Sequence, residues 1–208
     1  MLVQVFSGGP FFVNTYVVYS RRNGEGVIID PGNELVKIKS FVLAHHINIH
    51  SILLTHGHVD HILHINGFKK LTRAMIRMHA ADRELYAGAA EMARFFGLMK
   101  VENPEPIDET FVEGDTFVVG EQSLRVLETP GHSPGSVCFV VDGEFVITGD
   151  TLFNDGIGRT DLKGGSYSEI MASIKTKLLT LPEELVVYPG HGPSSTIGFE
   201  KTNNPFLE

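Results

Sequence analysis

The sequence has very little cysteine and no long hydrophobic run. Cys138 is the single cysteine among 208 residues, and it lies inside the apolar run 137–141. One cysteine cannot build a disulfide framework, which favours a reducing compartment. No apolar run approaches the ~20 residues of a membrane helix, and no basic and apolar leader opens the chain. We therefore expect a cytoplasmic protein with no membrane partner.

Basic charge is also scarce. The 17 Lys and Arg residues are outnumbered by 25 Asp and Glu residues, which gives a formal net charge of −8. Nucleic-acid-binding surfaces are basic, so this balance argues against a nucleic-acid partner. The sequence also has no low-complexity segment, no solenoid-like repeat and no clear linker. It therefore predicts one domain over residues 1–208, long enough to bury a large core.

Short apolar runs and helical patterns indicate a mixed α/β protein. We expect strands at 2–6, 12–19, 27–29, 51–54, 75–78, 116–119, 124–128, 136–141, 144–148 and 185–188. Helical patterns occupy about 35–42, 62–71, 80–96 and 167–179. Asn33 is expected to cap the first helix, and Gly88 to interrupt the third. Ser166 and Glu169 form a capping box that predicts the start of the last helix.

The most distinctive stretch is Thr55-His56-Gly57-His58-Val59-Asp60-His61, directly after the strand predicted at 51–54. Its three histidines and one aspartate can each donate a lone pair to a divalent cation. A histidine in a polar loop ordinarily meets only solvent or a backbone partner. Four such side chains in one turn, however, are more than a single tetrahedral ion needs. Their density suggests two metal ions.

Three more ligand candidates follow other predicted strands in the same way. They are His132, Asp150 and His191, each beside a glycine that lets the backbone turn sharply. Taken singly, each could be a turn residue or a capped loop histidine. Taken together, seven such residues at strand ends suit two ions that share a carboxylate bridge. The spacing does not say which histidine holds which ion.

These motifs resemble those of the metallo-β-lactamase superfamily, and in particular its glyoxalase II-like hydrolases, including their short single-domain members. The matching segments cover nearly the whole chain and are Thr-His-Gly-His-Val-Asp-His (55–61), Pro-Gly-His-Ser-Pro-Gly-Ser (130–136), Gly-Asp-Thr-Leu-Phe (149–153), Gly-Arg-Thr-Asp (158–161) and Pro-Gly-His-Gly-Pro (189–193). The resemblance implies a four-layer αββα sandwich, two mixed sheets face to face with helices outside. It implies one ion on His56, His58 and His132, a second on Asp60, His61 and His191, and Asp150 as the bridge.

The resemblance also implies two supporting roles. Asp30, at the end of a predicted strand, would accept hydrogen bonds from the His56 loop, although a simple turn before Pro31 also explains it. Arg159 would meet the substrate, although an ion pair with Asp161 is an equally ordinary fate. Glyoxalase II also carries a C-terminal helical domain that holds glutathione. We expect none here, because only seventeen residues follow His191.

The expected function is metal-dependent hydrolysis of a small-molecule thioester similar to S-lactoylglutathione. A hydroxide between the two metal ions would attack the carbonyl carbon, and Asp60 would orient it. Zinc is the expected metal, with iron or manganese as alternatives. We expect a monomer or a homodimer.

Three other functions remain open from the sequence. One is a persulfide dioxygenase with a single iron on His56, His132 and Asp150. Another is a lactonase-type hydrolase of the same superfamily. The third is a metal-binding or interaction module without catalysis.

The segment 80–100 contains an apolar cluster whose role the sequence does not decide. Its members are Met92, Phe95, Phe96, Leu98 and Met99. The ordinary expectation is that they belong to the core. The alternative is a lid or an oligomer contact beside the metal centre, because large exposed apolar patches usually have a binding role.

Overall fold

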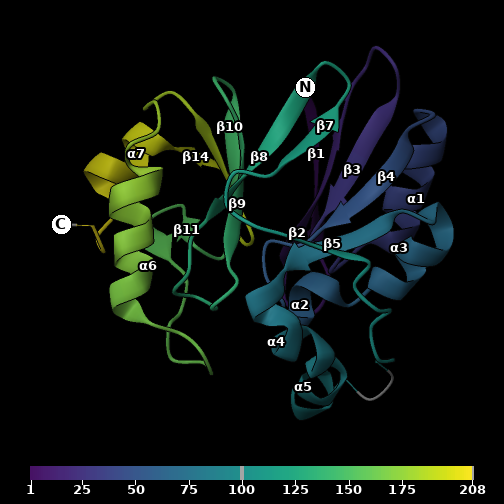
Figure 1. Cartoon of the computed structure of the whole chain (residues 1–208), viewed down its shortest axis with the longest axis horizontal. Helices are drawn as coiled ribbons and strands as arrows, with labels where there is room; N and C mark the ends of the chain where they lie inside the picture. The colour runs from purple at the N-terminus through teal and green to yellow at the C-terminus, as the bar shows by residue number, and fades with distance from the viewer. Residues whose placement is uncertain (99–100, 208) are drawn as a thin grey trace.

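The structure is a computed structural model, and it describes residues 1–98 and 101–207. Two six-stranded sheets form its centre (Figure 1). The first has the order β1 (Leu2–Gly8), β2 (Val13–Tyr19), β3 (Glu25–Ile29), β4 (Asn48–Leu53), β5 (Met75–His79) and β6 (Glu109–Phe111). The second has the order β14 (Ser195–Thr196), β13 (Val186–Pro189), β10 (Phe145–Gly149), β9 (Val137–Val141), β8 (Gln122–Glu128) and β7 (Thr116–Val119). A separate ribbon pairs β11 (Leu152–Phe153) with β12 (Gly156–Ile157).

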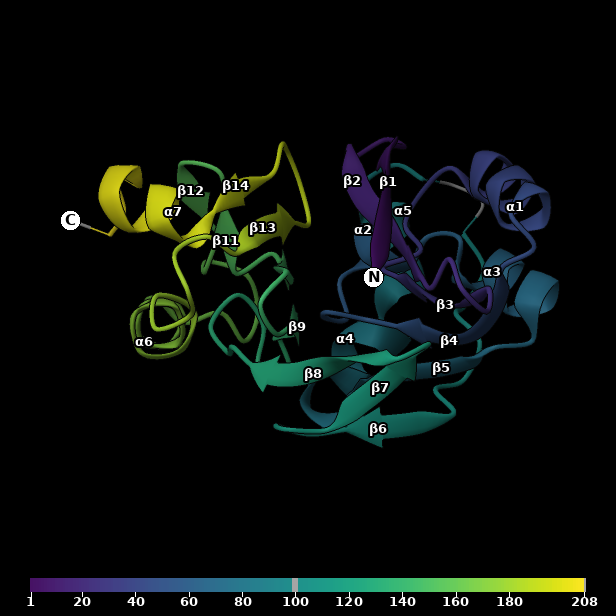
Figure 2. The ribbon, with the colours of Figure 1, turned by 90° about the horizontal axis from the view of Figure 1, so that it is seen from above.

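Helices cover the outer faces of both sheets. Beside the first sheet lie α1 (Leu35–Ala44) and α3 (Ile65–Thr72), and beside the second lie α6 (Tyr167–Ser173), its π-helical continuation (Ile174–Leu178) and α7 (Ile197–Asn203) (Figures 1 and 2). The short helices α2 (Val59–Ile62), a 3₁₀ turn (Ala80–Asp82), α4 (Arg83–Ala87) and α5 (Ala89–Phe95) lie together at the lower end of the sandwich in Figure 1. The four-layer αββα arrangement expected from the sequence is therefore confirmed.

Three hydrophobic cores correspond to the three interfaces between these layers. Alternate side chains of one strand enter different cores: Val17 faces the helices α1 and α3, whereas Tyr16 and Val18 face the second sheet. The third core lies between the second sheet and the helices α6 and α7, and it includes Ile170 and Leu178. Strands of both sheets are covered on both faces. They therefore appear in the sequence as continuous apolar runs and not as alternating apolar and polar residues.

The directions of the strands bring the ends of several of them to one edge. In the first sheet β3, β4 and β5 are parallel. In the second, β10 is parallel to β13 and antiparallel to β9, which is antiparallel to β8, so β8, β10 and β13 share one direction. Residues that follow these six strands therefore gather at the carboxyl edges of the two sheets, where α/β proteins commonly place their binding sites.

The structure corrects two local expectations. Asn33 does not cap α1: its buried side-chain amide donates to the carbonyl oxygens of Phe6 and Val13, and Glu34 takes the cap position with a left-handed backbone. The helix predicted at 62–71 is two helices, α2 and α3, with His64 between them. Gly88 separates α4 from α5, as the sequence indicates.

No helix within 1–98 and 101–207 has both the length and the apolar composition that crossing a bilayer requires.

Candidate metal centre

Four of the predicted ligands come from the short loop and helix after β4. His58 is the extended residue that precedes α2, and Asp60 and His61 lie within that helix. His56 and His61 are almost fully buried, with 1% and 0% of their surface exposed. The four-residue helix α2 therefore changes the direction of the chain, so that the ligands before it and the ligands within it face the same site.

The second sheet supplies the other three ligands from strand ends. His132 follows β8, Asp150 directly follows β10, and His191 follows β13. A backbone hydrogen bond of 2.7 Å, from the Gly190 amide to the Gly149 carbonyl oxygen, connects the segments at the ends of β10 and β13. All seven predicted ligands thus meet where the carboxyl edges of the two sheets face each other.

The ligand atoms form two groups. One atom from each of His56, His58 and His132 lies within 4.8 Å of the others, and the same holds for Asp60, His61 and His191. We call these the first and the second triad. His58 Nδ1 lies 2.8 Å from His132 Nε2 in the first triad, and His191 Nε2 lies 3.2 Å from Asp60 Oδ2 in the second.

Asp150 lies between the triads. Its Oδ1 is 3.3 Å from His61 Nε2, and its Oδ2 is 3.6 Å from both His132 Nε2 and His191 Nε2. A carboxylate whose two oxygens contact both groups of histidines is well placed to be shared by two cations.

Three buried polar atoms at the centre suit bound cations. His56 Nε2, His61 Nε2 and Asp150 Oδ1 are inaccessible to solvent and have no hydrogen-bond partner among the described residues. Leaving such atoms unpaired is costly, so they are normally paired with a donor, an acceptor or an ion. Imidazole and carboxylate ligands suit zinc, iron and manganese alike. The residues present therefore fit divalent metal ions, whose identity they do not define.

Protonation differs between the triads. Burial, reinforced by His132, lowers the pKa of His58 to about 4, and burial also lowers the pKa of His56 well below its usual value. For His61, burial acts in the same direction, but the charges of Asp150, Asp60 and Asp30 outweigh it and raise the pKa. Burial thus favours the neutral forms of His56 and His58, which can offer lone pairs, whereas the surrounding carboxylates favour the protonated form of His61.

Asp30 lies beneath the centre and is fully buried. Its carboxylate accepts hydrogen bonds from the Thr55 amide (2.8 Å), the Thr55 hydroxyl (2.6 Å) and His61 Nδ1 (2.9 Å). Asp30 also lies within 4.8 Å of His56 and His61 as a group that could itself hold an ion. Because both of its oxygens already accept hydrogen bonds, we interpret Asp30 as a support for Thr55 and His61. A residue that orients a metal-binding histidine in this way also fixes its tautomer.

Asp82 is a second buried support, which was not among the predicted site residues. Its carboxylate accepts from the Gly57 amide (2.9 Å), the Ser133 hydroxyl (2.6 Å) and the Gly135 amide (2.6 Å). These donors flank His56, His58 and His132, so one carboxylate joins the two loops of the first triad. The available signal was its position three residues after β5, which matches the position of other site residues after a strand.

The Arg159 side chain pairs with Asp161. Its guanidinium forms two 2.7 Å hydrogen bonds with the carboxylate of Asp161. Both side chains are more than half exposed. The backbone carbonyl of Arg159, however, accepts a 2.8 Å hydrogen bond from His132 Nδ1. This leaves His132 Nε2 as the atom that faces the first triad.

The apolar segment after residue 80 is not core at three of its positions. Phe95 is 83% exposed, Phe96 48% and Met92 41%. The expectation that these side chains are buried is therefore wrong, because α5 lies at the end of the sandwich and not over a sheet. Leu98 is partly buried against the first core, and Met99 lies outside the described residues.

The fold and the two triads define a protein of the αββα type with a histidine- and aspartate-rich metal centre. A family model described as the metallo-beta-lactamase superfamily matches residues 8–191, and the chain belongs to that superfamily. Membership supports a metal-dependent hydrolase.

Similar proteins carry different names. Hydroxyacylglutathione hydrolase GloC of Haemophilus influenzae is 36% identical, covering 100% of this chain and 98% of GloC. The crystal structure of TTHA1623 in a di-iron-bound form has a TM-score of 0.89 and 38% identity, covering 99% of this chain and 100% of that one. The BLEG-1 B3 metallo-beta-lactamase has a TM-score of 0.90 and 34% identity, covering 99% of both chains. Since GloC and BLEG-1 are named for different reactions, membership of the superfamily alone does not define the reaction.

Proposed function

We propose that this protein is a thioester hydrolase that works with two divalent metal ions. The observation that carries the proposal is the pair of triads on either side of Asp150, in which the buried Nε2 atoms of His56 and His61 have no hydrogen-bond partner among the described residues. One ion would be held by His56, His58 and His132, the other by Asp60, His61 and His191, with Asp150 shared. Zinc is our first expectation for both positions, and the di-iron form of TTHA1623 makes iron a serious alternative.

Bound divalent ions supply two effects at such a centre: they acidify water toward neutral pH and polarise a carbonyl oxygen. Asp60 is the residue that we assign to the reacting water. Its side chain is 20% exposed, and its Oδ2 is 3.2 Å from His191 Nε2. The Asp60 carboxylate is held by His191 and is also partly exposed to solvent. It can therefore accept a hydrogen bond from the attacking water and orient a lone pair of that water toward the carbonyl carbon.

A thioester suits this centre because its leaving group does not need to be protonated by a general acid. A thiol has a pKa of about 8.5, so it can leave as a thiolate without a protonated side chain. The nearby hydroxyl of Tyr16 is not free to act as an acid: it donates to the Pro189 carbonyl oxygen, and burial raises its pKa. The likeness to GloC over the full length supports the same substrate class.

A substrate panel tests the proposal. Protein with measured metal content would be assayed with S-lactoylglutathione, simple acyl thioesters, a lactone, a β-lactam and a persulfide. We expect thioesters to have the highest kcat/KM, and His58→Ala to abolish their hydrolysis while circular dichroism stays unchanged. Undiminished thioester hydrolysis by His58→Ala would refute the mechanism, and a clear preference for the lactone or the β-lactam would refute the substrate class.

The dioxygenase alternative has a distinct signature. It needs one iron on His56, His132 and Asp150, and it consumes oxygen with a persulfide. The convergence of Asp60, His61 and His191 within 4.8 Å favours the two-ion hydrolase, since a single-iron enzyme has no use for a second complete triad. One iron per chain together with persulfide-dependent oxygen uptake would decide for the dioxygenase.

A further inference from the structure

A cleft lies directly beside the first triad. It has a volume of about 430 Å³ and is lined by His58, Leu85, Ala89, Met92, Phe95 and Pro134, among others. We call it the α5 cleft. Ligand pockets of roughly 300–1,000 Å³ are usual for small molecules. His58 belongs both to the cleft and to the first triad, so the cleft borders the metal centre.

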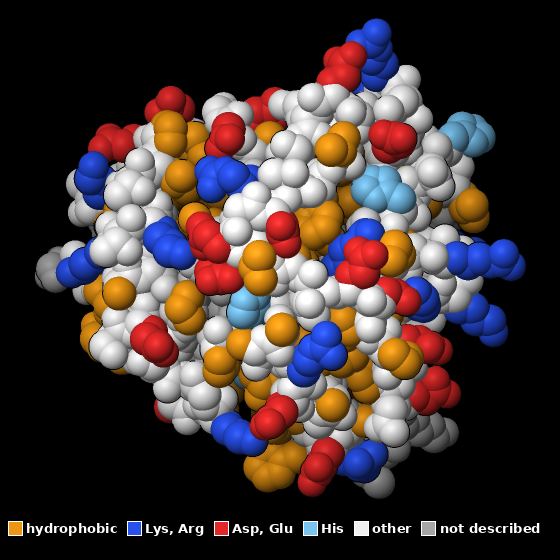
Figure 3. Space-filling view, in the orientation of Figure 1, with side chains coloured by type: hydrophobic (Ala, Val, Ile, Leu, Met, Phe, Trp, Pro, Cys, Tyr) orange, Lys and Arg blue, Asp and Glu red, His pale blue; other side chains and the backbone are white. Residues whose placement is uncertain are grey.

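The wall of the α5 cleft carries apolar side chains that nothing in the described chain covers. Met92 and Phe95, from successive turns of α5, are 41% and 83% exposed. In Figure 3 hydrophobic side chains reach the surface at the lower end of the molecule, where α4 and α5 lie in Figure 1. The end of α5 is held by an edge-to-face contact between Phe96 and Phe11, whose ring centroids are 5.5 Å apart. An exposed apolar wall beside a reaction centre usually serves to bind a ligand.

The charges of the cleft do not suit an anionic ligand. Lys163 and Glu84 at its mouth form an ion pair over 3.5 Å, and both side chains are more than four-fifths exposed. Glu91 adds a second carboxylate to the lining. Lys163 is therefore already paired with Glu84, and the lining has two carboxylates for this one ammonium group. The cleft thus offers little electrostatic attraction to a ligand that carries carboxylates, such as a glutathione moiety.

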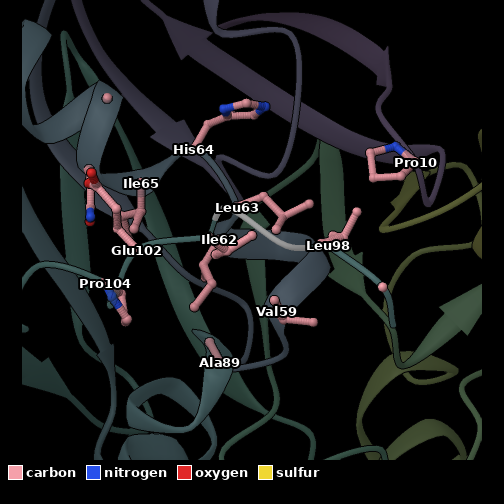
Figure 4. A pocket seen from close by; sticks show the side chains of 14 residues that line it. Pro10, Val59, Ile62, Leu63, His64, Ile65, Ala89, Leu98, Glu102 and Pro104 are labelled. Atoms are coloured by element: carbon pink, nitrogen blue, oxygen red, sulfur yellow. The ribbon is translucent and has the colours of Figure 1, made fainter. Parts of the chain in front are cut away.

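A larger cavity nearby does not compete with this interpretation. It has a volume of about 660 Å³ and borders α2 and α3, where Ile62, Leu63 and Leu98 line it (Figure 4). None of the seven predicted metal ligands is among its lining residues.

We propose that the α5 cleft binds a hydrophobic substituent of the substrate against Met92 and Phe95 while the scissile carbonyl lies at the metal centre. The inference rests on the proposed thioester hydrolysis and adds the class of substrate: a thioester with an alkyl or aryl group of several carbons on one side of the sulfur. Either the acyl half or the thiol half can carry that group, and the cleft recognises the same chemistry in both.

Two substrate series distinguish the halves. In one, straight acyl chains of two to eight carbons are joined to a constant small thiol, and in the other, thiols of the same lengths carry a constant acetyl group. Burying a methylene is worth a factor of about four in an equilibrium or rate. We expect kcat/KM to rise by about that factor per added carbon in one series, until the cleft is full, and to stay nearly constant in the other.

Variants link the trend to the cleft. Phe95→Ser and Met92→Ser should reduce the ratio of kcat/KM between the eight-carbon and two-carbon substrates at least tenfold. They should also weaken competition by a non-hydrolysable octyl thioether. Phe199→Ser is the matched control, because Phe199 is as exposed as Met92 but lies on α7. The high exposure of Phe95 makes its substitution compatible with folding, which circular dichroism would verify.

The possible failures are distinguishable. If no thioester of any length is hydrolysed, the proposed function is wrong. If thioesters are hydrolysed but neither series depends on chain length, or the serine variants keep the wild-type ratio, the proposed function stands and the α5 cleft is not a substrate site. A wild-type dimer that Phe95→Ser converts to a monomer with an unchanged ratio would also overturn this inference, because the apolar wall would then bind a second copy of the chain.

Discussion

The first and the second triad are held in place by different means. Asp82 contacts no ligand of the first triad directly, but it accepts from Gly57, Ser133 and Gly135 and so fixes the two loops that carry His56, His58 and His132. Asp30 instead accepts a hydrogen bond from His61 Nδ1 in the second triad itself. Asp82 therefore serves the loops of the first triad, whereas Asp30 joins His61 of the second triad to Thr55, the residue before His56. Loss of Asp82 should affect mainly the first metal position, and loss of Asp30 should also reach the second.

Loss of Asp150 should have the largest effect. Asp150→Asn removes the charge that both triads face, so we expect both ions to bind more weakly. The decrease in kcat should exceed the roughly 10–100-fold that follows when residues supporting metal ligands are changed. Metal analysis after dialysis, together with thioester hydrolysis, measures this effect. Retention of two tightly bound ions would show that Asp150 is not shared.

A methyl group on Gly190 should damage the second triad more than the first. A Cβ there would lie 2.8 Å from His61 Cε1 and would overlap Asp150 Oδ1. We expect Gly190→Ala to lose at least the second ion and most of the activity. Gly192→Ala is the control from the same motif: its φ of +78° makes alanine strained, but no atom lies within 4 Å of its Cβ. Equal metal loss in both variants would mean that the close approach at Gly190 is unimportant.

Substitution of the two supporting carboxylates should separate the ions. Asp82→Asn leaves one amide group facing three donors, and the metal affinity of the first triad should fall about 10–100-fold while the second keeps its ion. Asp30→Asn should weaken both triads, because Asp30 also accepts from Thr55 beside His56, with the larger loss at His61 in the second triad. Titration of metal-free protein with cobalt, followed by its absorption, resolves the two positions. If each variant weakened both positions equally, the separate support of the triads would be refuted.

Arg159→Ala should have the smallest effect on the metal centre. The exposed ion pair with Asp161 contributes little to stability, and the backbone carbonyl that holds His132 remains. We expect unchanged metal content and, if Arg159 meets a carboxylate or carbonyl of the substrate, a KM about 10–100-fold higher. Asp161→Ala should not raise KM, because it frees the guanidinium. A loss of metal in Arg159→Ala would instead indicate a structural role.

The strands and the candidate ligands can be recognised in the sequence from local patterns, whereas the four layers followed from the family resemblance. Strands that are covered on both faces are apolar throughout and can be recognised as continuous apolar runs. The candidate ligands 56–61, His132 and His191 lie beside glycines in short contiguous motifs, so each motif can be recognised by itself. Asp82 was not predictable in this way, because its role consists of hydrogen bonds to residues 25 to 53 positions away.

Two other misses have similar causes. Asn33 has the composition of a helix cap, but the β1–β2 hairpin offers its amide two carbonyl oxygens in a buried position. Met92, Phe95 and Phe96 have the composition of core residues, and only their placement at the end of the sandwich leaves them exposed. The strands β6 and β14 are too short for a periodicity signal.

Metal titration of the metal-free protein tests the two-ion centre most directly. Zinc would be added in steps to protein freed of metal, and bound metal and thioester hydrolysis would be measured at each step. We predict two equivalents bound per chain, with full activity reached only as the second is bound. Saturation of both binding and activity at one equivalent would contradict the account.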